Sequence, residues 1–330
     1  MADARASLPM AEAPPAEALL RPLLPRYGLA PDAPLERLCH SENETWAVGG
    51  TVFRLHRAGY HDAGEIASEI AWLQALRAMP GLACVCPRPD RKGHVLQTVA
   101  GRHVVACDRL PGRALDPGDD LARRFPELGA IAARLHAHAR GWPRPAGFRR
   151  KRWDAASLFG PRAIWGDWQA AEGLDTPGRT VLARLAEDLA ARLGAWGTGP
   201  ERFGLIHADL RLANLMTDGA ELTVIDFDDC GFGWWLFDFA AAVSFIEDDP
   251  RLPALAAGWA EGYRHVAPLS MAEEAMLPVM VLARRLQLTA WLASRAGNDT
   301  AAALGGAGFT AGTVALAEDY LSRGPARMWG

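Results

Sequence analysis

A short polar segment between two apolar runs carries the residues best suited to chemistry. The segment His207-Ala208-Asp209-Leu210-Arg211-Leu212-Ala213-Asn214 sets an aspartate and an asparagine five positions apart, and Asp226 follows the next apolar run, Leu222 to Ile225. Transfer of a phosphoryl group asks a protein to position a hydroxyl, to accept its proton and to neutralise the charge on the phosphates with a metal ion. Oxygen-bearing side chains in this arrangement meet those needs.

Each of these side chains suits a particular role. Mg²⁺ takes hard oxygen ligands and only one or two of them from a protein, so Asn214 and Asp226 are the expected metal ligands. Asp209 is the expected base that orients the acceptor hydroxyl and takes its proton. His207 is expected to brace the loop by hydrogen bonding, and the cation of Arg211 is placed to reach the γ-phosphate.

The elements that must position these residues follow from the apolar patterning. Three short runs, Leu35 to Cys39, Thr45 to Val48 and Thr51 to His56, predict an antiparallel meander, with Gly49-Gly50 as its hairpin turn. Val95 to Val99 and Val104 to Leu110 predict two further strands. Ile66, Ile70, Leu73 and Leu76 recur at helical spacing and predict a helix over Ala63 to Met79.

The remainder of the chain is predicted to be mainly helical, with a helix at about Phe125 to Arg140 and one island of strand. In that island, Gly204 to Ile206 leads into His207, and a hairpin with a turn at Asp218-Gly219 leads into Asp226. We therefore expect an α+β protein of two lobes. Residues 1–18 are expected to form a disordered tail, residues 19–110 an N-terminal nucleotide-binding lobe and residues 111–330 a C-terminal catalytic and substrate lobe.

The motif H-x-D-x-x-x-x-N followed by D-F resembles the catalytic and metal-binding loops of the protein-kinase-like superfamily, with Asp228 in place of the usual glycine. The local sequence more closely resembles the aminoglycoside phosphotransferase family in three segments: Leu205 to Asp209, Val224 to Asp229 and Phe237 to Ala240. That family also includes choline and homoserine kinases and a stress-response protein kinase. The resemblance implies a bilobal kinase-like fold, ATP and Mg²⁺ as cofactors, and the same roles for the catalytic loop, with Asp238 as a carboxylate that braces it.

The same resemblance extends over residues 35 to 295 and implies where the nucleotide binds. Residues 41–45, including Asn43 and Thr45, resemble the nucleotide-covering loop, and Leu128 to His138 resembles a helix ending in the family's Leu-His pair. ATP is then expected between the lobes, with its adenine edge near Asp108 to Leu110. The small lobe is expected to be a five-stranded antiparallel sheet with one helix.

One departure from the family concerns the phosphate-binding lysine of the third strand. This sequence has Arg54 there, with Glu69 on the following helix as its prospective partner. Arginine keeps the charge but not the geometry of lysine. We expect Arg54 to contact the α- and β-phosphates bidentately, so that the nucleotide pose shifts and binding is retained.

Composition limits the classes of partner. A net charge of -4 without blocks of like charge disfavours nucleic acid and anionic membrane surfaces. The first residues lack the pattern of a signal peptide, and no run reaches the ~18 apolar residues of a membrane helix, so we expect a soluble, cytoplasmic protein. Five cysteines without a C-x-x-C pair predict neither a disulfide framework nor a zinc site. The oligomeric state is left open.

Other suggestive residues have simpler interpretations. His136 and His138 lie two apart on a helix and so are expected to pack or face solvent, not to share a metal. Cys84 and Cys86 are expected to be buried thiols, and the basic run at residues 149–152 a solvated loop, with contact to an anionic substrate as the alternative. The tryptophans at 165, 168, 234 and 235 are expected to pack helices, with a cage for a cationic amine as the alternative.

These features lead to one main hypothesis and two rivals. The main hypothesis is an ATP-dependent kinase of the hydroxyl of a small metabolite, such as an amino alcohol, a homoserine-like or an aminoglycoside-like compound. A serine/threonine protein kinase of the stress-response type is the first rival, but the short stretch between Asp226 and Asp238 leaves little chain for a peptide-docking platform. A nucleotide-binding protein without catalysis is the second, and the missing lysine supports it. The acceptor itself is not determined, because fold alone does not fix function.

Overall fold

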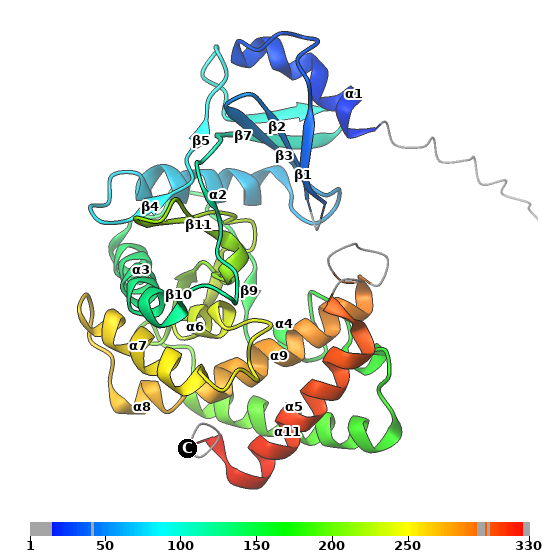
Figure 1. The fold of residues 1–330 in the computed structure, drawn as a ribbon, viewed down its shortest axis with the longest axis vertical. Coiled ribbons are helices and arrows are strands. Elements are labelled where there is room, and N and C mark those ends of the chain that lie inside the picture. Colours follow the sequence, from blue (N-terminus) through cyan, green and yellow to red (C-terminus); the bar gives the residue numbers. More distant parts are fainter. Residues whose placement is uncertain (1–14, 41–42, 296–300, 302–303, 326–330) are drawn as a thin grey trace, which may run out of the picture. The chain divides into compact units, whose positions relative to one another are not determined.

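The computed structural model describes residues 15–40, 43–295, 301 and 304–325. The chain divides into two compact units, one made of residues 1–61 and 88–109 and the other of residues 62–87 and 110–330. The first is built on a sheet and the second is mainly helical (Figure 1). The predicted α+β class is confirmed.

The smaller unit is built on an antiparallel sheet. Neighbouring strands follow the order β1-β2-β3-β7-β5, and β6 pairs with β7. The predicted meander is confirmed, but the sheet has six strands where five were expected, because the short β5 adds to its edge. The strands are β1 (Glu36–His40), β2 (Glu44–Val48), β3 (Thr51–Leu55), β5 (Pro87–Arg88), β6 (Leu96–Val99) and β7 (Arg102–Asp108).

Two short helical segments cover one face of this sheet. Helix α1 (Ala16–Leu20) and the 3₁₀ helix η1 (Arg21–Tyr27) supply apolar side chains that pack against Trp46, Phe53 and Val104 of the strands. Part of the segment predicted as a tail is therefore helix, since α1 begins at Ala16, while residues 1–14 lie outside the described residues. Burial of its leucines attaches this helix to the sheet.

Helix α2 (Ala63–Leu76) begins and ends close to its predicted limits. Asp62 caps its first turn by accepting from the backbone N–H groups of Gly64 and Glu65, and the Glu65 carboxylate accepts from the N–H of Asp62 in return. The contacts of α2 group it with the larger unit, whereas the sequence suggested a first lobe that runs unbroken to residue 110. The division of the chain into functional lobes stays a prediction.

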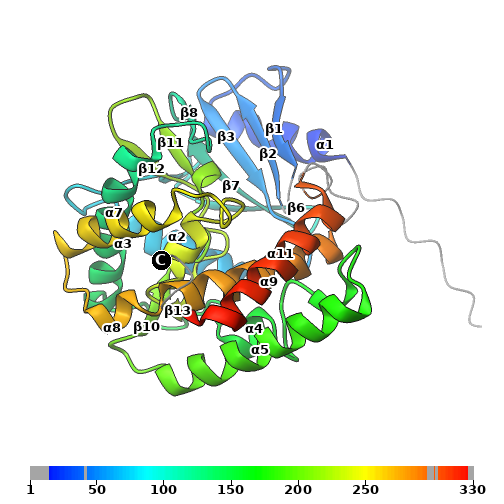
Figure 2. The same cartoon turned by 60° about the horizontal axis from the view of Figure 1, so that its bottom comes forward.

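Long helices make up most of the larger unit. Helices α3 (Leu121–Gly141) and α7 (Leu252–Arg264) pack closely, because Gly262 places no side chain over the backbone of Pro126. Helix α9 (Leu277–Ser294) is buried from Leu277 to Leu292, with α5, α6 and α11 packed around it (Figure 2). Its neighbours are α5 (Thr176–Trp196), α6 (Phe237–Ala242) and α11 (Gly306–Arg323), and the shorter helices are α4 (Ala155–Leu158), η2 (Trp168–Ala170), η3 (Leu212–Asn214) and α8 (Met271–Glu274).

Two small sheets in the larger unit carry the polar segment. One has the order β10-β13-β9 and the other the order β4-β12-β11-β8. The hairpin of β11 and β12 was predicted, whereas the pairing of β10 with β13 was not. The strands are β4 (Ala83–Cys84), β8 (Arg113–Ala114), β9 (Arg152–Trp153), β10 (Phe203–Ile206), β11 (Leu215–Thr217), β12 (Leu222–Val224) and β13 (Gly231–Trp234).

Across the described part of the chain, no helix combines the length and the apolar character needed to cross a membrane.

Candidate active site

The loop that follows β10 is held by one buried carboxylate. Asp238, at the start of α6, accepts from the backbone N–H of His207 at 3.2 Å and of Ala208 at 2.7 Å. Ala208 has a left-handed backbone with φ of +66°, which is unfavourable for a residue with a side chain. The two bonds to Asp238 hold the chain in this turn and so place Asp209 immediately after it. Asp238 lies where the family resemblance implied a bracing carboxylate.

Asp238 is itself held by a buried histidine. Its Oδ2 lies 3.0 Å from Nε2 of His136, and Nδ1 of that ring lies 3.1 Å from the Tyr263 hydroxyl. Burial outweighs the hydrogen bond to Asp238 and lowers the pKa of His136, so the ring is neutral at pH 7. Nε2 then donates to Asp238 and Nδ1 accepts from Tyr263. His136, for which sequence suggested packing, thus supports the loop, while His138 contacts Trp72 through Nδ1.

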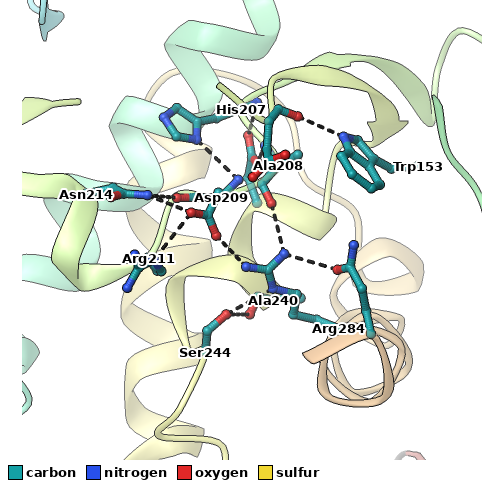
Figure 3. Close-up of polar contacts among 12 residues, drawn as sticks. Trp153, His207, Ala208, Asp209, Arg211, Asn214, Ala240, Ser244 and Arg284 are labelled. Carbon is teal, nitrogen blue, oxygen red and sulfur yellow. Dashed lines mark hydrogen bonds and ion pairs between the residues drawn. The ribbon is translucent and has the colours of Figure 1, made fainter. Parts of the chain in front are cut away.

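The Asp209 carboxylate is the centre of the cluster. Its Oδ2 accepts from Nδ2 of Asn214 at 2.7 Å and lies 3.3 Å from Nε of Arg211. Its Oδ1 accepts from Nη2 of Arg284. Donors from the loop and from α9 therefore fix both oxygens, as Figure 3 shows.

Arg284 is the site residue that the sequence reasoning missed. It is 1% exposed, and besides Asp209 it contacts Ser244 through Nε at 3.1 Å and Gln287 through Nη1 at 3.1 Å. A buried cation is costly unless it is paired and hydrogen-bonded. The signal was present in the sequence, because Arg284 and Arg285 interrupt a helix that is otherwise almost entirely apolar. Such arginines require partners, but the sequence does not say which.

The His207 ring connects the loop at residues 207–214 to the segment that follows β12. Nδ1 accepts from the backbone N–H of Asp209 at 3.2 Å, so Nε2 carries the proton that is donated to the Ile225 carbonyl at 3.1 Å. The ring also lies 4.5 Å from the centre of the Phe227 ring. Both ring nitrogens are engaged in contacts within the protein, and the bracing role of His207 stays a prediction.

Asn214 and Asp226 lie at the same end of the hairpin. Asn214 precedes β11, Asp226 follows β12, and the backbone N–H of Ile225 donates to the Asn214 carbonyl at 2.9 Å. Nδ2 of Asn214 is directed to Asp209, which leaves its Oδ1 as the oxygen for a cation. Asp226 has a left-handed φ of +59°. An amide and a carboxylate oxygen fit Mg²⁺, which completes its shell with phosphates and water.

The residues predicted to contact nucleotide are divided between the two units. Thr45 on β2 pairs with Arg54 on β3, and Asn43 accepts from the N–H of Arg57 through Oδ1 at 2.9 Å. Asp108 ends β7, and its Oδ1 lies 3.5 Å from Nη1 of Arg88. In the larger unit, Glu69 is buried on α2, and Leu110 is the first residue after the end of the sheet unit.

The aromatic residues considered as a cage pack against the protein itself. Arg284 lies over the Trp165 ring at 4.9 Å and Arg140 over the Trp235 ring at 4.5 Å. Trp234 meets Phe203 edge to face with 5.4 Å between ring centres. The packing interpretation is confirmed for these rings, since arginines of this chain lie over two of them.

The basic run and the cysteines had different outcomes. Arg150 is 8% exposed, because its guanidinium donates inward to backbone carbonyls. The expectation of a solvated loop is therefore wrong for this residue.

Cys84 is half-buried and burial raises its pKa to about 11, as expected for an unreactive thiol. In the described part of the chain no cluster of three histidine, cysteine or carboxylate residues forms a metal site.

Comparison with known proteins agrees with this architecture. A sheet unit joined to a helical unit with such a catalytic loop defines the class of protein-kinase-like phosphotransferases. Residues 39–273, more than two thirds of the chain, match the model of the phosphotransferase enzyme family. The chain belongs to this family, the aminoglycoside phosphotransferase family that its motifs indicated.

Particular relatives have several activities. A homoserine kinase of Beijerinckia indica subsp. indica is 32% identical over 204 residues, which are 61% of this chain and 60% of that protein. A solved microcompartment-associated aminopropanol kinase is 41% identical, with a TM-score of 0.87 over 94% of this chain and 99% of the other. An amicoumacin kinase in complex with AMP-PNP, Ca²⁺ and the compound Ami shares the fold, with a TM-score of 0.73 at 20% identity over 90% of this chain and 92% of that one.

Proposed function

We propose that the protein transfers the γ-phosphate of ATP to the hydroxyl of a small amino alcohol. The observation that carries this proposal is the Asp209 carboxylate, fixed beside Asn214 in a chain that resembles an aminopropanol kinase over almost its whole length. That likeness is closer and more complete than the likeness to the homoserine kinases of Beijerinckia indica and Gluconobacter oxydans, of which 60% and 67% are covered. Homoserine is the second acceptor to consider.

In the proposed reaction, Asp209 is the base. The acceptor hydroxyl donates a hydrogen bond to the carboxylate, its oxygen forms a bond to the γ-phosphorus, and the bond from that phosphorus to the bridging oxygen of ADP breaks. The proton of the hydroxyl passes to Asp209 as the new bond forms. Mg²⁺, held by Asn214 and Asp226 when bound, neutralises charge on the β- and γ-phosphates.

The two arginines on Asp209 suit different tasks in this scheme. The Arg284 side chain is 2% exposed and contacts Oδ1, whereas the Arg211 side chain is 27% exposed and lies 3.3 Å from Oδ2. Arg211 can exchange its longer contact for the γ-phosphate and so leave Oδ2 for the incoming hydroxyl. Arg284 keeps the carboxylate oriented while this happens.

The residues proposed to hold the nucleotide are those that the family resemblance indicated. Asn43 and Thr45 would cover the phosphates and Arg54 would contact the α- and β-phosphates. The backbone from Asp108 to Leu110 would meet the adenine edge, and the pairing of Arg54 with Glu69 remains a prediction. Arginine in place of lysine keeps a permanent cation for the phosphates.

The segment between Asp226 and Asp238 supports a small acceptor over a protein acceptor. It contains a turn, in which the N–H of Cys230 donates to the Phe227 carbonyl at 2.9 Å, and then β13, which pairs with β10. No long loop stands here as a platform for a peptide. A binding protein without catalysis would not need a base held as firmly as Asp209.

The test is an acceptor panel with product identification. Wild-type protein with ATP and Mg²⁺ would be offered 1-amino-2-propanol, ethanolamine, choline, homoserine, an aminoglycoside and a generic protein substrate, with ADP release and phosphorylated product measured together. We expect the highest kcat/KM for an amino alcohol that lacks a carboxylate. A preference for homoserine would select the second acceptor, and transfer to protein alone would contradict the proposal.

A further inference from the structure

Arg150 is a buried cation outside the catalytic loop that joins two parts of the larger unit. It lies between α3 and β9, and its guanidinium donates through Nε to the Cys230 carbonyl at 2.6 Å and through Nη1 to the Glu65 carbonyl at 2.9 Å. Nη2 donates to the carbonyl of Asp228. Among the described residues, its hydrogen bonds therefore all go to main-chain carbonyls.

The planar guanidinium is what makes this arrangement possible. It presents five N–H donors in a rigid fork, and it stays protonated at every pH that the protein meets. Burial of a charge costs free energy unless the charge is paired and hydrogen-bonded. Besides the three carbonyls, the nearby carboxylates of Glu69, Asp228 and Asp229 favour the charged form and help to raise the pKa of Arg150. A lysine has a single charged nitrogen and cannot span three separate carbonyls. The contacts of Arg150 thus require arginine specifically.

Two of these carbonyls belong to the chain just beyond the proposed metal ligand. Asp228 and Cys230 follow Asp226 within the turn that the bond from Cys230 N–H to the Phe227 carbonyl closes. Asp226 has a left-handed backbone, which costs free energy unless its surroundings hold it. By fixing the carbonyls on the far side of the turn, Arg150 limits how the turn, and hence the Asp226 carboxylate, can rotate.

The third carbonyl belongs to the first turn of α2, and other contacts connect α2 to the same turn. The Trp72 ring of α2 meets the Phe227 ring edge to face, with 5.4 Å between ring centres. The backbone N–H of Arg149, beside Arg150, donates to the Ser68 hydroxyl of α2 at 3.0 Å. Helix α2 and the segment from Asp226 to Cys230 are therefore held as one assembly through the 149–150 segment.

We propose that Arg150 is a positioning residue that sets the geometry of the Asp226 carboxylate for Mg²⁺ by joining α2 to the turn at residues 227–230. The inference rests on the proposed function, since it concerns the metal of that site. Arg150 touches neither nucleotide nor acceptor in this account. Loss of Arg150 should change the Mg²⁺ concentration that nucleotide binding requires. Residues that orient a metal ligand typically contribute tenfold to a hundredfold in metal affinity.

The chain offers a matched control in the same basic run. Arg152 is a half-exposed arginine whose Nε contacts Asp154 at 2.9 Å and whose guanidinium lies over the Phe203 ring at 4.2 Å. Its contacts do not include the turn after Asp226. Arg152→Met removes the same charge from the same segment, and so reports any general effect of local charge on nucleotide binding.

The experiment measures binding of AMP-PNP by calorimetry across a Mg²⁺ titration, together with thermal unfolding, for wild type, Arg150→Met, Arg150→Lys and Arg152→Met. We expect the Mg²⁺ concentration for half-maximal binding to rise about tenfold in Arg150→Met and by a smaller factor in Arg150→Lys. Arg152→Met should match wild type. A purely structural role would lower the melting temperature and leave the Mg²⁺ requirement unchanged.

The outcomes distinguish failure of the role proposed for Arg150 from failure of the proposed function. An unchanged Mg²⁺ requirement in folded Arg150→Met overturns the inference while the proposed function stands. If Arg150→Met does not fold, the same result in Arg150→Lys overturns it, because lysine also loses carbonyl contacts. If wild-type protein shows no Mg²⁺-dependent binding of AMP-PNP, the proposed function fails first, and the inference fails with it.

Discussion

The proposed catalytic loop at residues 207–214 and the proposed metal-ligand segment at residues 226–230 are stabilised in different ways. Buried charged and polar side chains from α3, α6 and α9 converge on the catalytic loop, and Asp238 and Arg284 are the main ones. One arginine that donates to backbone carbonyls, together with ring packing of Phe227, holds the metal-ligand segment.

This difference has a physical consequence. Each buried ionic partner of the catalytic loop leaves an opposite charge or several donors unsatisfied when it is removed, so loss of one should cost stability as well as activity. The Asp226 carboxylate, by contrast, is proposed to act through a bound metal, so its loss should reduce Mg²⁺-dependent binding of nucleotide. The following changes test that contrast, from the largest expected effect to the smallest.

Asp226→Ala should remove the carboxylate proposed to bind the metal. Because loss of a residue that only orients a metal ligand costs tenfold to a hundredfold, loss of a ligand should reduce phosphoryl transfer by at least about a hundredfold. Mg²⁺-dependent nucleotide binding, measured by calorimetry, should weaken with it. Asp218→Ala, at the exposed turn of the same hairpin, is the control and should behave as wild type. Unchanged nucleotide affinity in Asp226→Ala would remove the metal assignment.

Arg284→Met should destabilise the protein and impair catalysis together. The substitution leaves the Asp209 carboxylate, 13% exposed, without its buried cation. Breaking a buried ion pair in this way costs about 3–5 kcal/mol, which urea unfolding would measure. Arg192→Met on α5 removes a surface pair with Asp188 and should cost less than about 1 kcal/mol. Equal effects of the two substitutions would show that the catalytic loop does not depend on buried charge.

Asp238→Asn keeps the size of the side chain and changes its hydrogen bonding. An amide cannot accept from the N–H groups of His207 and Ala208 and from His136 at once, since one of its ends is a donor. We expect a loss of about 1–3 kcal/mol in the free energy of unfolding. kcat should fall more than KM for ATP rises, because the loop that carries Asp209 shifts.

The matched change for this prediction is Asp249→Asn. Asp249 forms a surface pair with Arg251, so this variant should unfold like wild type. A stable and fully active Asp238→Asn protein would show that the bonds to His207 and Ala208 do not determine the catalytic loop.

The buried His136 should make stability sensitive to acid, the smallest effect in this series. Burial lowers its pKa in the folded protein below the ordinary value of 6.5. The unfolded chain then binds the proton first as pH falls, so stability is unaffected above about 6.5 and is lost as pH drops below it. Unfolding curves at pH 7.5 and 5.5 should show a larger acid loss in wild type than in His136→Gln. An equal loss in both would place the sensitivity elsewhere.

Much of the local structure was predictable from the sequence, because its signals are local. Short apolar runs and the Gly49-Gly50 turn predicted the meander. Polar residues beside apolar runs predicted that Asp209 follows one strand and that Asp226 follows the hairpin, which Asn214 precedes. The spacing of Asp209 and Asn214 predicted one loop that carries both residues. The contact between Nδ2 of Asn214 and Oδ2 of Asp209, at 2.7 Å, was not predicted.

What sequence did not predict depends on partners far along the chain. Arg284 contacts Asp209 across 75 positions, and no local pattern pairs a charge on α9 with a loop after β10. Arg150 stands in a basic run typical of solvent-exposed loops, and only the packing of α2 beside the 226–230 turn makes its burial favourable. The pairing of β10 with β13 was also not predicted, because these strands are neighbours in the sheet although β11 and β12 separate them in the chain.

The central claim, that Asp209 is the base of a phosphoryl transfer, is tested most directly by Asp209→Asn with the best acceptor from the panel. Binding of AMP-PNP with Mg²⁺ and single-turnover transfer from ATP would be measured on the same preparation. Asparagine cannot accept the proton, so transfer should fall at least about a hundredfold while nucleotide binding is retained. Transfer at the wild-type rate in a folded Asp209→Asn protein would contradict the account.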